Sequence, residues 1–296
     1  MCGIVGLFLK NPALETQLGA FTARMLGTMC DRGPDSAGFA VYGSGVEGEV
    51  KLTLRGPLAT DFQALASSLG AAGFPVAFTL HDTHAVVRLP AARADVAAAW
   101  LAANAPSIEI VGRGGRMTLF KEVGAPDRVA ERFGLAKMAG THAIGHTRMA
   151  TESAVTINGA HPYSTGADQC LVHNGSLSNH NNIRRILRHE GQDFATDNDT
   201  EVAAGYLPWR MRQGLPLGEA LDACLADLDG FYTFVVGTEN GFGVLRDGIA
   251  CKPAVMAETE DYVAFGSEYR ALADLPSVEK ARIWEPEPAT VYFWER

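Results

Sequence analysis

The chain has 296 residues, of which 47% are hydrophobic and 20% are charged, and such a composition is typical of a globular protein with a full core. Its formal net charge of −9 argues against a nucleic-acid-binding surface, which would need clustered Lys and Arg. No apolar run approaches the roughly 18 residues of a membrane span, and the N-terminus lacks the basic stretch and apolar core of a signal peptide. We therefore expect a cytoplasmic protein with no membrane segment and no nucleic-acid partner.

The predicted elements include more strands than helices. In chain order the sequence predicts a strand at 4–9, a helix at 14–30, strands at 39–42, 76–80 and 85–89, a helix at 94–103, a strand at 117–120, a helix at 126–133, strands at 143–146 and 170–173, helices at 181–190, 199–213 and 217–228, and strands at 233–237, 243–246, 263–265 and 290–294. Because strands and helices do not alternate strictly, packed sheets flanked by helices are favoured over a doubly wound parallel sheet. Residues 56–118 are rich in Ala and predict a small α+β insertion.

Cys2 is the most informative residue for function. Met1 is normally removed when a small side chain follows it, and Cys2 would then carry both a thiol and a free α-amine, whose ordinary pKa is about 7.7–8.0. An amine that titrates near the working pH can take the thiol proton and return it to a leaving amine. The apolar residues that follow predict a buried strand. Taken alone, this segment also fits an inert buried cysteine. The five cysteines form no CxxC pair, which favours a reduced compartment.

Two polar clusters follow predicted strands. Arg148 ends one strand within GHTRMAT, and a guanidinium there can hold a carboxylate through two parallel hydrogen bonds. Taken alone, a surface arginine at a strand end is the preferred interpretation, because most arginines are exposed. Asn174 and Gly175 follow the strand at 170–173, where the side-chain amide and a backbone N–H can receive a developing oxyanion. Asn-Gly alone is more often a turn.

Two further clusters precede a helix and a strand. Residues 196–202 (TDNDTEV) precede a predicted helix, so one carboxylate could cap that helix while another faces a substrate ammonium group. A capping box is the simpler interpretation of this segment. The turn at 32–38 (RGPDSAG) can place Arg32 beside Cys2, where a positive charge favours the thiolate, while Asp35 fixes the turn.

As an ordered set, the segments MCGIVG, RGPDSAG, GHTRMAT, HPY, LVHNGSLSN, NDTEV and SEYRAL resemble the class II glutamine amidotransferases, which are N-terminal-nucleophile hydrolases. The resemblance covers residues 2–55 and 119–296. It implies one domain from 2 to 296, interrupted by an insertion at 56–118. The fold implied is an α+β, four-layer αββα sandwich of two antiparallel sheets.

The resemblance also implies roles for individual residues. Cys2 corresponds to the nucleophile, Asn174 and Gly175 fall on the oxyanion hole, and Arg32 is expected to support the site. The implied ligands of glutamine are Arg148 for the α-carboxylate and Asp199 for the α-ammonium group, with Thr151 and His161 on the pocket wall.

The sequence contains no recognisable second catalytic domain. The chain is therefore most similar to the stand-alone glutaminase subunit of glutamate-synthase-type complexes such as N-methylglutamate synthase. This implies glutamine as substrate and transfer of ammonia to a flavin-dependent glutamate-synthase-like subunit, with a further synthase subunit in the complex. The implied cofactors, FMN and as a second candidate an iron–sulfur cluster, belong to those partners, and none is expected in this chain.

Two other functions stay open at this point. An N-terminal-cysteine amidase acting on another substrate would not need both Arg148 and Asp199. A non-catalytic scaffold or regulatory subunit would follow if Met1 were retained, because Cys2 would then have no free amine. A metal site at His142 and His146 is disfavoured, since this spacing lies on a predicted strand rather than on an HExxH helix.

Overall fold

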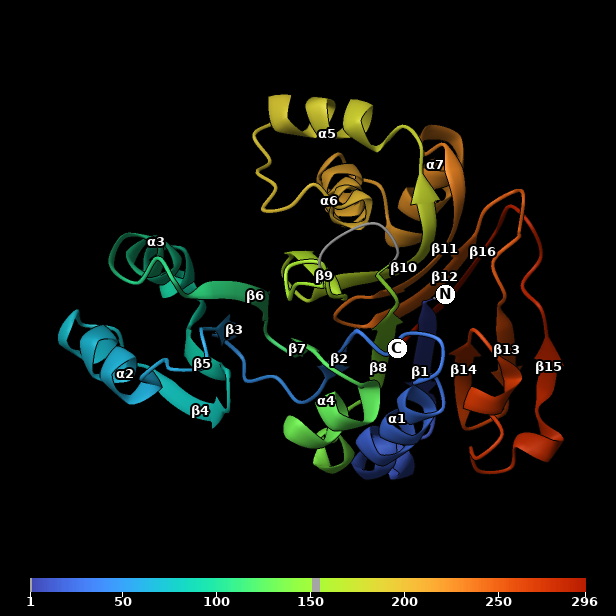
Figure 1. The fold of residues 1–296 in the computed structure, drawn as a ribbon, viewed down its shortest axis with the longest axis horizontal. Coiled ribbons are helices and arrows are strands. Elements are labelled where there is room, and N and C mark those ends of the chain that lie inside the picture. The colour runs from blue at the N-terminus through green and yellow to red at the C-terminus, as the bar shows by residue number, and fades with distance from the viewer. Residues whose placement is uncertain (1, 151–154) are drawn as a thin grey trace.

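In the computed structural model, two antiparallel sheets pack face to face between two layers of helices (Figure 1). The structure describes residues 2–150 and 155–296. The seven-stranded sheet has the order β15-β13-β14-β1-β8-β2-β7, and the five-stranded sheet has the order β16-β12-β11-β10-β9. The predicted sandwich of antiparallel sheets covered by helices is confirmed.

The elements of the sandwich have the following bounds. The seven-stranded sheet contains β1 (Gly3–Leu9), β2 (Ser36–Tyr42), β7 (Met117–Val123), β8 (His142–Arg148), β13 (Val255–Glu258), β14 (Tyr262–Gly266) and β15 (Arg282–Trp284). The five-stranded sheet contains β9 (Tyr163–Gly166), β10 (Gln169–Leu177), β11 (Gly230–Gly237), β12 (Gly241–Arg246) and β16 (Thr290–Glu295). The first sheet is covered by α1 (Leu18–Gly27) and α4 (Pro126–Arg132), and the second by α5 (His180–His189), α6 (Asp199–Arg212) and α7 (Leu217–Asp227). Short 3-10 helices are η1 (Pro12–Gln17), η2 (Ala91–Arg93), η3 (Leu135–Lys137), η4 (Tyr269–Ala271) and η5 (Val278–Lys280).

Strand β1 shows why the central strands have continuous apolar sequences. Val5, Leu7 and Leu9 pack with the helices on the outer face of the seven-stranded sheet. Ile4 and Phe8 point the other way, into the core between the two sheets. A strand buried on both faces gains from apolar side chains at every position, so its sequence does not alternate. This double burial carries the first residues of the chain into the centre of the sandwich.

The small α+β unit projects to one side of the sandwich (Figure 1). Its elements are β3 (Glu49–Arg55), α2 (Phe62–Ala71), β4 (Ala77–His81), β5 (His84–Pro90), α3 (Ala94–Asn104) and β6 (Glu109–Gly114), and its sheet has the order β4-β5-β3-β6. The predicted boundary at residue 56 is therefore wrong, because β3 already belongs to this sheet. At the other end, β7 starts at Met117 and belongs to the sandwich, so the expected end at 118 lies just inside that strand.

Asp168 joins the small unit to the five-stranded sheet. Its carboxylate accepts hydrogen bonds from the backbone N–H groups of Gly115, Arg116 and Met117 at 2.6, 2.8 and 2.7 Å. Its own N–H donates to the carbonyl oxygen of Arg113 at 2.8 Å. One side chain thus ties the turn between β6 and β7 to the turn between β9 and β10.

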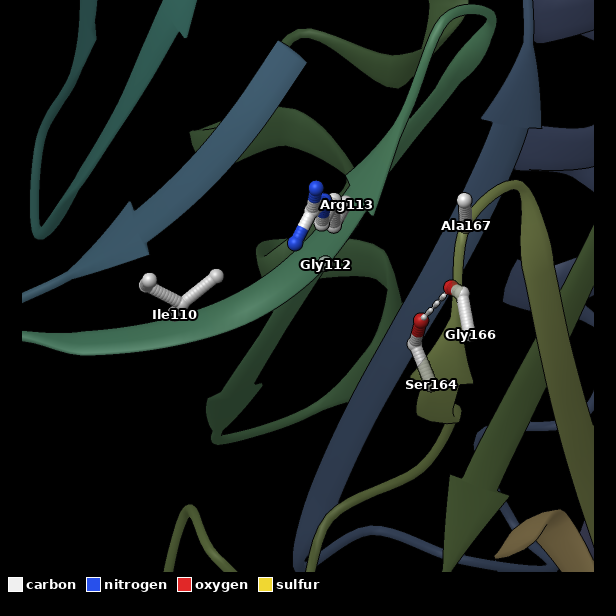
Figure 2. Close-up of a pocket in the computed structure, with 6 residues that line it drawn as sticks. All are labelled: Ile110, Gly112, Arg113, Ser164, Gly166 and Ala167. Atoms are coloured by element: carbon white, nitrogen blue, oxygen red, sulfur yellow. Dashed lines mark hydrogen bonds between the residues drawn. The ribbon is translucent and has the colours of Figure 1, made fainter. Parts of the chain in front are cut away.

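A groove of about 270 Å³ lies beside this joint, between β6 and β9 (Figure 2). Figure 2 shows Ile110 and Arg113 of β6 on one side of the groove. Ser164 and Gly166 of β9 lie on the other side, where the Ser164 hydroxyl donates to the Gly166 carbonyl at 3.3 Å.

No helix in the described residues is long and apolar enough to span a membrane.

Candidate active site

A pocket of about 500 Å³ lies where the start of β1, the end of β8, strand β10 and the start of α6 meet. The predicted site residues that line it are Cys2, Arg148, His161, Asn174, Gly175 and Asp199. Thr151 lies outside the described residues, as does Met1. Four segments that are distant in the sequence therefore converge on one cavity.

Cys2 is held at the pocket through its main chain. Its carbonyl oxygen accepts hydrogen bonds from Arg32 Nε at 3.0 Å and from Asn174 Nδ2 at 3.2 Å. The next residue, Gly3, donates its N–H to Thr147 Oγ1 at 3.2 Å. Arg32 also forms an ion pair with Glu268 at 2.5 Å. The guanidinium thus lies beside Cys2, where it binds the carbonyl oxygen and a carboxylate, and its effect on the thiol stays a prediction.

Asn174 and Gly175 lie on β10 next to Cys2. Gly175 has a φ of +149°, and a Cβ atom there would lie 2.0 Å from the carbonyl oxygen of Phe231. A side chain cannot fit so close to the neighbouring strand, so the position requires glycine. Asn174 is buried and directs its amide nitrogen toward the Cys2 carbonyl. Its side-chain amide therefore lies within hydrogen-bond distance of the main chain of Cys2.

Arg148 is the last residue of β8, is only 8% exposed and lines the pocket. A Cβ atom at Gly159 would lie 3.1 Å from Arg148 Nη1, so the glycine leaves room for the guanidinium. The RGPDSAG turn holds this strand end in place. Asp35 accepts a hydrogen bond from the Ala150 N–H at 2.7 Å and donates its own N–H to the Arg148 carbonyl at 3.1 Å. Asp35 therefore fixes the strand end that carries Arg148, in addition to its own turn.

Asp199 is the first residue of α6, but it does not cap this helix. The cap is Asn198, whose side-chain oxygen accepts the N–H of Thr200 at 2.8 Å. Asp199 Oδ2 accepts the N–H of Leu177 at 2.9 Å, and Oδ1 lies 3.8 Å from His173 Nδ1. The carboxylate is thus oriented by β10. It lines the same pocket as Arg148 and carries the opposite charge.

A group of buried side chains lies at the wall of the pocket, and only His161 among them was predicted to contact the substrate. The Thr200 hydroxyl lies 2.8 Å from His161 Nε2 and 2.9 Å from His173 Nδ1, and His146 stacks on His161 with ring centroids 4.0 Å apart. Burial lowers the pKa of His146 to about 3, and burial together with the neighbouring histidines holds the pKa of His161 well below its usual value. The rings are therefore neutral at ordinary pH. The sequence places a histidine inside each of three motifs, which was the available signal.

Lys252 is a second missed residue of the pocket. It lies in the loop after β12, and its ammonium group is 5.0 Å from the centre of the Phe231 ring. Burial and the charge of Lys252 lower the pKa of His173, against the opposing effect of Asp199. A lone lysine in a loop carries no motif that could have marked it.

In the described residues, no group of three or more His, Cys, Asp or Glu side chains could hold a metal ion. His142 and His146, which share one strand, bond to different carbonyl oxygens, those of Thr238 at 2.8 Å and of His173 at 3.0 Å. The Nε2 atoms of the two rings thus serve separate structural contacts.

Comparison with known proteins decides the family. The chain is 62% identical over 296 residues to the "Glutamine amidotransferase-like protein GlxB" of Rhizobium meliloti (strain 1021), covering all of this chain and 98% of that protein. It is 33% identical over 304 residues to a "Putative glutamine amidotransferase" of Methanothermobacter thermautotrophicus, covering 99% of each. The chain belongs to the class II glutamine amidotransferases. The family model described as "Glutamine amidotransferase domain" matches residues 146–274, which include the predicted ligands of glutamine.

Longer members of the family match only in part. The chain is 31% identical over 137 residues to the glutamine–fructose-6-phosphate aminotransferase of Vibrio vulnificus (strain YJ016), covering 46% of this chain and 22% of that enzyme. Among solved structures, the glutamine phosphoribosylpyrophosphate amidotransferase of B. subtilis superposes with a TM-score of 0.62 at 21% identity. That match covers 99% of this chain and 47% of the other, and it supports the class II fold.

Proposed function

We propose that this chain hydrolyses the side-chain amide of glutamine at Cys2 and passes the ammonia to a partner synthase subunit. One observation carries the proposal: Cys2, Asn174, Arg148 and Asp199 line a single pocket. A free amino acid presents a carboxylate and an ammonium group on one carbon, and the pocket offers a cation and an anion to receive them. The thiol then meets the far end of the same substrate.

Recognition would proceed through the two charged residues. Arg148 would bind the α-carboxylate with two parallel hydrogen bonds, and Asp199 would accept from the α-ammonium group with the oxygen that does not bind Leu177. Gly159 leaves the guanidinium free of steric conflict, and Asp35 keeps the end of β8 in position. A substrate lacking either charge would lose one of these contacts.

The chemistry would begin once Met1 has been removed. The α-amine of Cys2 takes the thiol proton, and the sulfur attacks the amide carbon to form a tetrahedral oxyanion. Asn174 Nδ2 and the Gly175 N–H would stabilise this oxyanion, for which the Asn174 amide turns from the Cys2 carbonyl toward the substrate. The amine returns its proton to the departing ammonia, which leaves a γ-glutamyl thioester. Water then hydrolyses the thioester, releases glutamate and restores the thiol.

We further propose that the acceptor chemistry belongs to other chains. The match to the GlxB relative covers 98% of that protein, whereas the match to the glutamine–fructose-6-phosphate aminotransferase covers only 22% of that enzyme. Our candidate is a flavin-dependent glutamate-synthase-like subunit that holds FMN, with an iron–sulfur cluster as a second cofactor and a further synthase subunit. N-methylglutamate synthase is one complex of this type.

The test measures glutamate release from glutamine by the purified chain and by a Cys2→Ala variant, alone and with co-purified partner subunits. We expect low activity from the chain alone, a rise when the partner binds, and none from Cys2→Ala. Coupling of about 1–3 kcal/mol would correspond to a rise of roughly 5–150-fold. Full activity without partners would contradict the subunit proposal. Parental activity in the Cys2→Ala variant would contradict the assignment of Cys2 as the nucleophile.

A further inference from the structure

The sheet of the small unit has two chemically different faces. On one face, Val50, Leu52 and Leu54 of β3 pack under α2 and α3 in a separate apolar core. The alternate residues of β3 therefore lie on the opposite face, which includes Glu49, Lys51 and Arg55. The apolar face explains how the unit folds, whereas the charged face has no such role.

This charged face borders a cleft of about 240 Å³ between the small unit and the seven-stranded sheet. Lys51, Thr79 and Arg88 line it from the small unit, and Thr118 and Phe120 of β7 line it from the sandwich. No Asp or Glu is among the described residues that line this cleft. It shares no lining residue with the pocket of Cys2.

Lys51 and Arg88 are directly opposite each other in the antiparallel pair of β3 and β5. Like charges at such positions destabilise a sheet. Lys51 is also only 7% exposed, and burying an ammonium group is costly unless an anion compensates it. Neither side chain forms an ion pair among those found in the described part of the chain.

The ammonium group of Lys51 is held in place by main-chain acceptors. Its Nζ donates to the carbonyl oxygens of Ser44 at 3.0 Å and Arg116 at 2.9 Å. Two of its three N–H donors are therefore used, and one remains for a further acceptor. Burial, followed by the charge of Arg88, lowers the pKa of Lys51 to about 8, against the opposing effect of Asp168, and an added anion would reverse more of this shift.

We propose that this cleft binds a small oxyanion, a carboxylate or phosphate group of a metabolite, between Lys51 and Arg88. The guanidinium of Arg88 can bind two oxygens in parallel, and Lys51 supplies a fixed point charge. The hydroxyls of Thr79 and Thr118 can donate to the remaining oxygens. A volume of about 240 Å³ is large enough to admit a small metabolite. Because residues of both units line the cleft, a bound anion would also fasten the small unit to the sandwich.

The test measures binding by calorimetry and thermal unfolding, with inorganic phosphate and succinate as probes and sodium chloride at equal ionic strength as reference. We compare the unaltered protein with Arg88→Gln and with the control Arg93→Gln. Arg93 lies in the same unit, outside the cleft, with its guanidinium 5.0 Å from the Phe74 ring. Both variants remove one positive charge from an exposed position, so net charge alone cannot distinguish them.

We expect at least one probe to raise the unfolding temperature above the chloride reference. Arg88→Gln should weaken its binding at least tenfold, and Arg93→Gln should change it less than twofold. Preference for phosphate identifies a phosphorylated ligand, and preference for succinate identifies a carboxylate. The proposal is overturned if neither probe raises the unfolding temperature above the chloride reference, or if both variants weaken binding of the probe equally. Glutamate release provides an independent readout, since Arg88 lies outside the Cys2 pocket and its variant should retain the parental rate.

Discussion

Replacement of Asp199 by Asn tests how the pocket recognises its substrate. Asn retains an oxygen that can accept the N–H of Leu177, now at 2.9 Å, and it has nearly the same shape as Asp. The change therefore removes the negative charge and little else. A hydrogen bond to a charged group contributes about 1.5–3 kcal/mol, so kcat/KM for glutamine should fall roughly 10- to 150-fold.

The chain offers a matched control two residues away. Asp197 has a fully exposed side chain, and its nearest cationic partner, Arg184, is 4.0 Å away. Asp197→Asn makes the same chemical change outside the pocket and should leave kcat/KM within twofold of the parental value. The assay is glutamate release at varied glutamine concentration.

A second substrate separates recognition from folding. N-acetyl-L-glutamine has no α-ammonium group, so the carboxylate of Asp199 has no charge to bind in it. We expect the parental protein to turn it over poorly, and Asp199→Asn to lower that residual activity less than threefold. Equal losses with both substrates would show that Asp199 supports the fold of the pocket rather than the ammonium group. An unchanged kcat/KM for glutamine would show that Asp199 does not contribute to the recognition of glutamine.

The remaining predictions concern binding, stability and pH. Arg148→Lys should raise KM for glutamine by an amount corresponding to about 1.5–3 kcal/mol, because an ammonium group cannot form two parallel hydrogen bonds, and an unchanged KM would remove Arg148 from the pocket contacts. Asp168→Ala should lower the free energy of unfolding in urea by at least about 3 kcal/mol, since three backbone N–H groups lose a charged acceptor, and a loss below about 1 kcal/mol would contradict its role as the joint. Stability should also fall as pH drops from 7 to 5, because burial lowers the pKa of His146 to about 3 and the unfolded chain then binds the extra proton below about 6.5. His146 alone accounts for about 2 kcal/mol over that range, and equal urea midpoints at both pH values would contradict a neutral buried ring.

The sequence predicted the sandwich well because its strands are buried on both faces. Segments such as β1 are apolar at every position, so they stand out without any knowledge of their partners. Strand β3 was missed although Val50, Leu52 and Leu54 alternate with polar residues, a pattern that predicts a half-buried strand. The boundary error at residue 56 follows directly from this missed strand.

The candidate site was predictable only through the order of its motifs. Nothing in the spacing of Cys2, Arg148 and Asp199 places them in one cavity, since the approach depends on pairing of β1 with β8 and on packing of the two sheets. The main-chain contacts of Cys2 depend on the same packing. Lys252 and Thr200 were missed because each is a single polar residue whose role appears only when its neighbours are in place.

The most direct test of the account is the mass of the N-terminal peptide from protein mixed briefly with glutamine and quenched in acid. The account predicts a peptide that begins at Cys2, with Met1 absent, and a fraction that carries one glutamyl group on the Cys2 sulfur. A peptide that retains Met1, or a processed peptide that never carries the glutamyl group while glutamate is released, would contradict the proposed nucleophile.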